Sequence, residues 1–346
     1  MLNRLSDGTW LLDHSTIESY QSCRKMFELQ HLRNLRPNTL PAAMDMGGAF
    51  HAGIEAYRLG GTEQDIVEAV RRRGENLPFA STESKRSIEN CVEMVGRYID
   101  HWDSPGHRVY DVMTVPVPEG ACWTGEGSTC KVCGCYRAVH TAIGLGVDVQ
   151  FQCSPRPLVE VVHRVILCEV PRRIVYVGKM DALLIHRSTS DLWVDELKTT
   201  SRLSAKFMEQ VRPNNQGTGY VKIASETLGR RVAGWILDAA LVAEKVASPR
   251  RKPEDWFARN ASHRSQDELN DWYRDTVTIA NEICILVEAW IEGDNVRWIK
   301  SAPAACHRYD GCMFLPICRT LEDPGVIASE FHEEQWDLIE MGRKPL

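Results

Sequence analysis

The chain has 346 residues, a quarter of them charged, and a formal net charge of −6 at pH 7. This length, with 43% apolar residues, is enough for one large domain or two modest ones with a real core. An apolar run of about 18 residues or more is absent, which excludes a membrane-spanning helix. The first ten residues lack the apolar stretch of a secretory signal, so we expect a cytoplasmic protein. A basic groove can coexist with an acidic body, so the net charge leaves nucleic acid open as a partner.

The first hundred residues are predicted to be mainly helical. The segment Ser15-Thr-Ile-Glu18 has the pattern of a capping box, and the helix that it opens carries Tyr20, Cys23 and Phe27 on one face. A second helix is expected from near Asp45, with an apolar stripe of Phe50, Ile54 and Tyr57. Two further segments have helical patterns, at residues 62–76 and 83–102.

After residue 107 the pattern changes to strands. Runs rich in β-branched residues and bounded by polar or proline-containing turns predict strands, and they lie at 109–117, 158–167, 174–185 and 192–199. Helical residues follow around 203–227, and the apolar run 232–242 indicates a further strand. A capping box at Ser265-Gln-Asp-Glu268 begins a long helix that ends near Gly293.

The run VGKMDALLIHRSTSDLWVDELKTT predicts a hairpin of two antiparallel strands. A turn centred between residues 188 and 189 places Asp181 opposite Glu196, and opposed side chains lie about 5 Å apart at Cβ. Lys198 is two positions after Glu196 and shares its face, whereas Asp195 points the other way. Two carboxylates at this distance suit one Mg²⁺ ion, which could generate an attacking hydroxide, and Lys198 could orient that water or stabilise negative charge.

The same three charged residues would also fit an ordinary solvated hairpin face. The flanking residues are apolar, however, and favour a half-buried site: Val177, Ala182, Leu183, Leu184, Trp193, Val194 and Leu197.

Twelve cysteines is a high number for a chain in a reducing compartment, where clustered thiols are more often metal ligands than disulfides. One cluster contains Cys306, Cys312 and Cys318. The other lies in a Gly- and Cys-rich stretch, residues 118–145, which reads as an insertion rather than a regular element. Its Cys122, Cys130, Cys133 and Cys135, with His140 as a spare ligand, could hold a structural zinc ion, or the insertion could bind no metal.

The hairpin resembles a known family. GKMDALLI followed by VDELKTT resembles the GxxD and (D/E)xK elements of the PD-(D/E)xK nucleases, in the RecB-like branch with RecB, AddB and CRISPR-associated four-cysteine exonucleases. The segment GGAFHAGIEAY resembles the family's helix whose histidine, here His51, reaches the metal. Gln216 and Tyr220 match the QxxxY element, which lies beside the active site, and Glu160 is a looser match to a further acidic residue. The resemblance implies metal ligands at His51, Asp181 and Glu196, and a catalytic set that adds Lys198, Gln216 and Tyr220.

The resemblance extends to four cysteines. Cys23 resembles the N-terminal cysteine of iron–sulfur members, and Cys306, Cys312 and Cys318 resemble their C-terminal trio, so the four would bind a [4Fe–4S] cluster. Five residues separate Cys306 from Cys312, where the helicase–nuclease members have two. This departure keeps a structural zinc ion open as the alternative.

The resemblance predicts an α/β, restriction-endonuclease-like fold with a mixed central sheet flanked by helices. We expect a single nuclease domain over residues 1–346, with a helical region at 15–104, the catalytic core at 157–245 and the C-terminal cysteine segment at 300–320.

The expected function is that of a Mg²⁺- or Mn²⁺-dependent DNA exonuclease acting on single-stranded ends, in a bacterial or phage-infected cytoplasm. DNA repair, phage recombination and CRISPR adaptation are the settings that fit, with their proteins as partners. The alternative is a non-catalytic nucleic-acid-binding or assembly subunit, although such a subunit has no need of a lysine beside two carboxylates.

Overall fold

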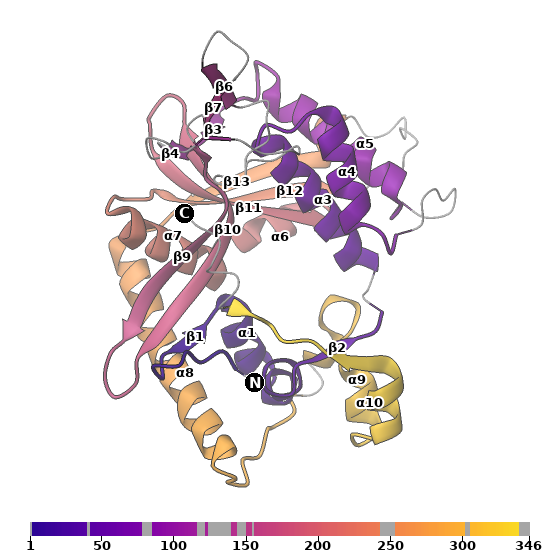
Figure 1. The fold of residues 1–346 in the computed structure, drawn as a ribbon, viewed down its shortest axis with the longest axis vertical. Coiled ribbons are helices and arrows are strands. Elements are labelled where there is room, and N and C mark those ends of the chain that lie inside the picture. The colour runs from indigo at the N-terminus through magenta and orange to yellow at the C-terminus, as the bar shows by residue number, and fades with distance from the viewer. Residues whose placement is uncertain are drawn as a thin grey trace.

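A mixed sheet of seven strands forms the centre of the computed structural model (Figure 1). The structure describes residues 2–39, 42–77, 85–115, 122–123, 140–143, 150–153, 156–242, 253–301 and 305–338. The strand order is β1-β10-β11-β12-β13, and β3 and β9 also pair with β10. The strands are β1 (Trp10–Leu12), β3 (Tyr110–Val112), β9 (Val159–Cys168), β10 (Ile174–His186), β11 (Leu192–Thr200), β12 (Gly234–Leu241) and β13 (Phe257–His263).

The long strand β10 changes partners along its length. Its first half pairs with β1 and β9, and its second half pairs with β3 and β11. Strand β11 pairs with β12 in parallel from Trp193 to Thr200, but it pairs with β10 only from Leu192 to Asp195. The sheet therefore opens into a fork between Asp181 on β10 and Glu196 on β11.

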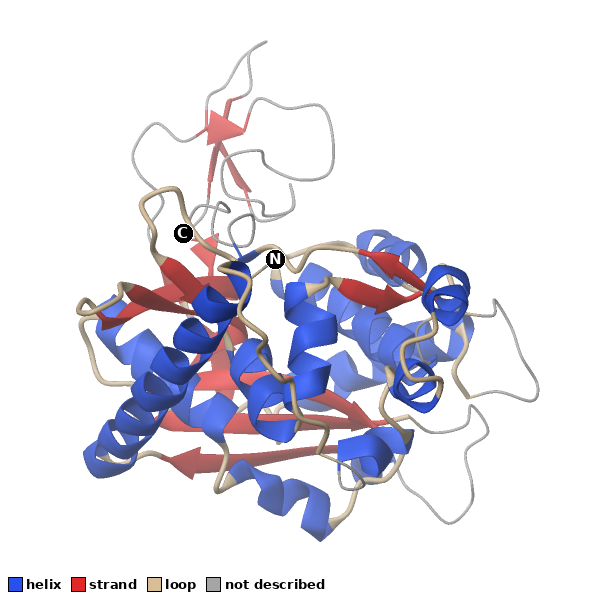
Figure 2. Cartoon of the chain, turned by 90° about the horizontal axis from the view of Figure 1, so that it is seen from below, coloured by secondary structure: helices blue, strands red, loops and turns tan. Residues whose placement is uncertain are grey.

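Helices cover both faces of the sheet (Figure 2). Val194 of β11 packs in a core with α1 (His14–Ser22), α7 (Asn215–Leu228) and α8 (Gln266–Ile291). Leu197 of the same strand packs in a second core with α3 (Ala42–Arg58), α4 (Glu63–Arg73) and α5 (Ile88–Asp103). This alternation follows from the period of two along a strand, and it leaves the fork between the two helical layers.

A third, smaller core joins the two ends of the chain. The strands β2 (Leu35–Pro37) and β14 (Phe331–Glu333) pair, and beside them lie α2 (Arg24–Phe27), α9 (Leu315–Arg319) and α10 (Pro324–Glu330) (Figure 1). Leu29, Phe314 and Phe331 are buried in this core. Residues about 300 positions apart in sequence are thereby held together.

The structure confirms the predicted α/β architecture and corrects several details. The first helix begins at His14, because the Asp13 carboxylate accepts the Thr16 backbone N–H at 2.8 Å and caps it two residues before Ser15. That helix ends at Ser22, and Cys23 is extended, so the predicted continuous face through Phe27 is wrong. The capping box at Ser265 and Glu268 is confirmed.

The cysteine-rich insertion contains regular structure, contrary to the sequence expectation. The short strands β5 (Cys122–Trp123), β6 (His140–Ile143) and β7 (Gln150–Cys153) form a separate three-stranded sheet. Cys130, Cys133 and Cys135 lie outside the described residues, as do the side chains of Cys122 and His140, so the zinc expectation stays a prediction. Within the described part of the chain, none of the helices is long and apolar enough to cross a membrane.

Candidate active site

The hairpin of β10 and β11 has the register that the sequence predicts. Ala182 pairs with Asp195, and Ile185 pairs with Leu192, so the next pair outward would be Asp181 and Glu196. The ladder stops before that pair. The two carboxylates therefore stand at the mouth of the fork.

The Asp181 carboxylate takes the place of a ladder hydrogen bond at this point. Its Oδ2 accepts the backbone N–H of Leu197 at 2.7 Å, and its Oδ1 lies 3.4 Å from Nδ1 of His51. One oxygen thus anchors the side chain to β11, and the other faces α3 across the fork. The family resemblance predicted His51 at this site, whereas the residues of the hairpin alone did not.

Three potential metal ligands converge beside Asp181. Ligand atoms of His51, Glu160 and Asp181 all lie within 4.8 Å of one another, from three different elements. Glu160, on β9, has a φ of +53°, in the left-handed region that is uncommon for a residue other than glycine. Its carboxylate is also paired with Lys179, which precedes Asp181 by two positions on β10. The interpretation of the hairpin sequence did not include Lys179, although the side-chain period of two along a strand places it on the same face as Asp181.

Glu196 belongs to a second set of contacts on the other side of Asp181. Its Oε1 accepts hydrogen bonds from Lys198 Nζ at 2.5 Å and from Gln216 Nε2 at 3.0 Å. Gln216 also lies 3.2 Å from the Tyr220 hydroxyl, so the QxxxY pair and the ExK pair form one network. Glu196 is outside the group of three ligands around His51. The fork therefore holds two adjoining clusters that meet at Asp181.

The charges in the fork shift one another's pKa values. Burial would raise the pKa of Asp181, but His51 and Lys198 together with the Leu197 amide lower it to about 2. Burial raises the pKa of Glu160 to about 6, and burial with the neighbouring Asp181 raises that of Glu196. Burial opposes the charged forms of His51 and Lys198, yet the carboxylates beside them raise both pKa values. Such a concentration of carboxylates with a lysine is suited to holding a divalent cation.

The helix α7, which carries Gln216, packs closely against its neighbours at two glycines. A Cβ at Gly217 would lie 2.3 Å from Trp235, and one at Gly219 would lie 2.5 Å from Trp272. Neither glycine has room for a larger side chain. The QGTGY sequence therefore brings Gln216 and Tyr220 within reach of the sheet.

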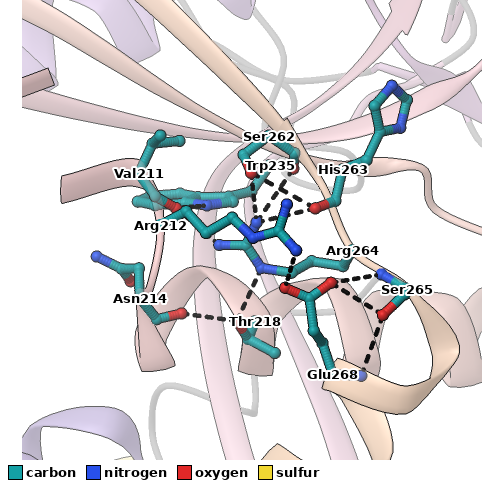
Figure 3. A network of polar contacts seen from close by, with 10 residues as sticks. All are labelled: Val211, Arg212, Asn214, Thr218, Trp235, Ser262, His263, Arg264, Ser265 and Glu268. Atoms are coloured by element: carbon teal, nitrogen blue, oxygen red, sulfur yellow. Dashed lines mark hydrogen bonds and ion pairs between the residues drawn. The ribbon is translucent and has the colours of Figure 1, made fainter. Parts of the chain in front are cut away.

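A buried arginine fixes the start of that helix (Figure 3). Arg264 is 3% exposed and donates hydrogen bonds to the Thr218 hydroxyl at 2.8 Å and to the Val211 carbonyl at 2.7 Å. Trp235 Nε1 donates to the same carbonyl at 2.9 Å, and the Asn214 side chain caps the helix by accepting the Gly217 N–H at 2.8 Å. Sequence reasoning did not single out Arg264, because its partners are distant in sequence.

Asp195 faces the opposite side of β11, as the hairpin register requires. It is fully buried and accepts a hydrogen bond from Arg58 at 2.6 Å. The equally buried Asp238 accepts hydrogen bonds from Arg259 at 2.7 Å and from the Tyr98 hydroxyl. These pairs dock α3 and α5 on the sheet behind Glu196, which supports the choice of Glu196 over Asp195 as the residue that faces the fork.

The structure also brings together the four cysteines from the ends of the chain. Cys23, Cys306, Cys312 and Cys318 all line one cavity of about 210 Å³, with Met26, Leu29, Phe314 and Leu315 among its walls. In the described part of the chain, the His51, Glu160 and Asp181 group is the one set of three ligands within 4.8 Å. By the same criterion, no three of the four sulfur atoms lie within 4.8 Å of one another.

Similarity to known proteins identifies the family of the chain. A search of curated proteins found no match. Among solved structures, the chain is similar to a protein from Eubacterium rectale described as "Putative exonuclease", at 9% identity and a TM-score of 0.43, covering 87% of this chain and 88% of that one. The model of the PD-(D/E)XK nuclease superfamily matches residues 12–319. Since that match spans most of the chain and includes the fork, the protein belongs to the PD-(D/E)XK nuclease superfamily and has its restriction-endonuclease-like fold.

Proposed function

We propose that the protein is a divalent-metal-dependent DNA exonuclease of the RecB-like branch, and that it acts on single-stranded ends. The observation that carries the proposal is the meeting of His51, Glu160 and Asp181 within 4.8 Å beside the Glu196–Lys198 pair. A nuclease acts on nucleic acid, and this donor set of carboxylate oxygens and one imidazole suits Mg²⁺ or Mn²⁺. The choice of DNA, of ends and of single strands comes from the resemblance of the motifs.

Each residue of the fork has its own role in this proposal. His51, Asp181 and Glu160 would hold the cation. Glu196 lies on the other side of Asp181, outside this group of ligands. A bound divalent cation lowers the pKa of water and neutralises charge that builds on the scissile phosphate. Lys198, 42% exposed at its side chain, is positioned by Glu196 and presents its ammonium to that charge. Gln216 holds the Glu196 carboxylate through its amide N–H.

The test uses purified protein on end-labelled and circular single-stranded DNA, with Mg²⁺, with Mn²⁺ and with chelator. Asp181→Ala and Lys198→Ala should each lose at least about 100-fold in rate, as removal of a charge-stabilising group commonly does. Asp191→Ala and Lys206→Ala are matched controls, because both side chains are exposed and lie outside the fork. Equal activity of wild type and both fork variants would overturn the proposal, and rapid cleavage of circular DNA would overturn the exonuclease mode.

We further propose a [4Fe–4S] cluster on Cys23, Cys306, Cys312 and Cys318. Four thiolates are the ligand set of such a cluster, and all four line one cavity with apolar walls. A zinc ion bound to four thiolates at about 2.3 Å would hold the sulfurs within about 4 Å of one another. The four thiols line a cavity of about 210 Å³, which is more room than a single zinc ion needs, and this favours the larger group.

The cluster is tested by elemental analysis of protein purified without oxygen. We expect about four iron atoms per chain and a brown colour, both lost in Cys312→Ser and retained in Cys168→Ser. Cys168 is a half-buried thiol that does not line the cavity. Colourless protein with one zinc ion per chain that disappears in Cys312→Ser would replace the cluster by zinc.

A further inference from the structure

Two pairs of a carboxylate and a lysine flank Asp181 in the fork. On the β11 side, Lys198 Nζ contacts Glu196 at 2.5 Å. On the β9 side, Lys179 contacts the carboxylate of Glu160. The proposed hydrolysis gives a role to Lys198 and none to Lys179. The side chains of the two lysines are nearly equally exposed, 42% for Lys198 and 41% for Lys179, so both are accessible to a substrate.

The strand register explains how Lys179 comes to this place. Met180 pairs with Val161 between β10 and β9, so the next pair outward would be Asp181 and Glu160. Lys179 is two positions before Asp181 and shares its face. Glu160 therefore lies within reach of both residues: it pairs with Lys179 and belongs to the ligand group of Asp181.

Lys179 also lies within the open stretch of β10. The pairing of this strand with β1 ends at Tyr176, and its pairing with β11 begins at Ala182 (Figure 1). In the described part of the chain, neither β1 nor β11 pairs with the residues in between. The fork opens at this stretch, and Lys179 stands in it as Asp181 does.

The contact with Glu160 positions the Lys179 ammonium and leaves it able to bind another group. An ammonium has three N–H donors and no acceptor, so donors remain beyond the contact with one carboxylate. Glu160 has a φ of +53°, which is uncommon for a residue other than glycine and persists only where the surrounding structure holds it. Its carboxylate is thus a fixed anchor for a flexible side chain. Restricting that side chain before a ligand arrives lowers the entropic cost of binding.

A phosphate is the ligand that suits this ammonium. Its oxygens accept hydrogen bonds from charged donors, and its charge is opposite to that of lysine. The alternative role for Lys179 is that of a counter-ion, which only neutralises Glu160. A counter-ion would affect all nucleic acid ligands alike, whereas a phosphate-binding lysine acts at one linkage of the strand.

We propose that Lys179 binds the phosphate next to the scissile one on the same strand, and that Glu160 positions its ammonium for this contact. The proposal rests on the proposed function, because the strand reaches Lys179 only if the fork holds the scissile phosphate. Lys198 and Lys179 lie on opposite sides of Asp181, so the two lysines would contact successive phosphates. Contacts to phosphate do not depend on the base sequence.

The test removes the charge of one phosphate at a time. Single-stranded oligonucleotides carry one neutral methylphosphonate, placed at each of the terminal linkages in turn, and the products of wild-type protein identify the scissile linkage. Affinities are measured in Ca²⁺ with the Glu196→Gln variant, which keeps the contact of Lys179 with Glu160 and lacks a carboxylate of the fork. A gel run after each measurement checks that the strand is intact.

We expect a methylphosphonate next to the scissile linkage to weaken binding about tenfold, as the loss of one hydrogen bond between charged groups predicts. The double variant Glu196→Gln/Lys179→Gln should bind the unmodified strand more weakly by a similar factor and should be insensitive to that methylphosphonate alone. The slope of log affinity against log salt concentration should become shallower by about 0.7, as for one phosphate contact to a single strand.

Two further variants in the same background serve as controls. Lys179→Arg keeps the positive charge and should keep the sensitivity to the methylphosphonate. Lys222→Gln removes another lysine that is paired with a glutamate, since Lys222 contacts Glu226 at 2.7 Å on α7, and it should bind every strand like the parent. Thermal melting checks that each variant is folded.

The outcomes separate this contact from the hydrolysis. If Lys179→Gln weakens binding of all strands equally and keeps the sensitivity of the parent at every linkage, Lys179 is only a counter-ion and the nuclease stands. Lost sensitivity at the scissile linkage itself would likewise overturn the assignment to the neighbouring phosphate. If wild-type protein does not degrade DNA with Mg²⁺ or Mn²⁺, the proposed function fails in its own assay, and this inference fails with it.

Discussion

The Asp181 carboxylate accepts the backbone N–H of Leu197 at 2.7 Å, where the ladder between β10 and β11 ends. The side chain thus replaces the next main-chain hydrogen bond, and it is held rigidly at the opening of the sheet. Its other oxygen is left to face His51 at 3.4 Å. One residue both ends the ladder and offers a metal ligand.

This double role predicts different results for two substitutions of Asp181. Asp181→Asn keeps an acceptor for the Leu197 amide but removes the charge that His51 and Lys198 stabilise, so we expect a moderate loss of thermal stability. Asp181→Ala leaves that amide without its acceptor, which costs about 1–3 kcal/mol for a buried group. Both variants should be inactive on DNA. Thermal melting should therefore rank Asp181→Ala below Asp181→Asn, and the reverse order would contradict the role of Asp181 in the ladder.

The close packing of α7 predicts that one added methyl group at Gly217 lowers both stability and activity. Gly217→Ala places its Cβ 2.3 Å from Trp235, so the helix must move, at a cost of about 1–3 kcal/mol. The movement displaces Gln216 from Glu196 and should lower kcat. Gly96→Ala is the control, since its Cβ meets nothing within 4 Å in α5 and alanine favours helix by about 0.5–1 kcal/mol. Denaturant unfolding with steady-state kinetics would measure both effects, and Gly217→Ala with wild-type stability would refute the packing argument.

The buried ion pair of Arg58 and Asp195 behind the site predicts that a substitution at Arg58 lowers stability strongly and that a second substitution at Asp195 restores part of it. Arg58 and Asp195 are 5% and 0% exposed at their side chains, so Arg58→Met leaves a buried carboxylate without its cation. Such a loss commonly costs about 3–5 kcal/mol. The double variant Arg58→Met/Asp195→Leu should recover much of it, because neither charge then remains. Urea unfolding of the two single variants and the double variant gives the coupling free energy, and simple additivity would rule out a direct interaction.

The sequence predicts the parts of the site that depend on local rules. The period of two and the polar turn are enough to align Asp181 with Glu196 and to turn Asp195 away. Contacts from distant segments are a different matter. His51 and Gln216 were found only through the family resemblance, because their distance from the hairpin is set by how helices pack on the sheet. Arg264 has no local signal at all, since its acceptors on Val211 and Thr218 meet only in the folded chain.

Competing local and tertiary signals explain why some helices and strands were predicted wrongly or missed. Ser15 and Glu18 have the pattern of a capping box, but Asp13 is a better placed cap and starts the helix earlier. The sequence of β13 (FARNASH) does not alternate between apolar and polar residues, so it gives no signal of a strand. It is a strand because it pairs with β12 at the edge of the sheet. Tertiary context decides such segments more than their own residues do.

Two buried histidines predict how stability depends on pH. His163 is 1% exposed, its ring nitrogens have no hydrogen-bond partner among the described residues, and burial lowers its pKa to about 4. Burial likewise lowers the pKa of His31 to about 4. In the unfolded chain a histidine has a pKa of about 6.5, so between these values the unfolded state binds more protons. The contribution of these two histidines to stability is therefore complete above pH 6.5 and is lost as the pH drops toward 4.

The variant His163→Leu isolates this contribution. Each lowered pKa corresponds to at most about 3 kcal/mol between pH 6.5 and 4, at about 1.4 kcal/mol per pH unit. Removing His163 should flatten the decline in the free energy of unfolding by up to that amount, while His31 keeps the rest of the slope. His332→Leu, at an exposed position of β14, controls for the loss of a histidine as such. Urea unfolding at pH 7.5, 6, 5 and 4.5 measures the slopes, and a His163→Leu slope equal to that of wild type would show that this histidine takes up its proton in the folded state.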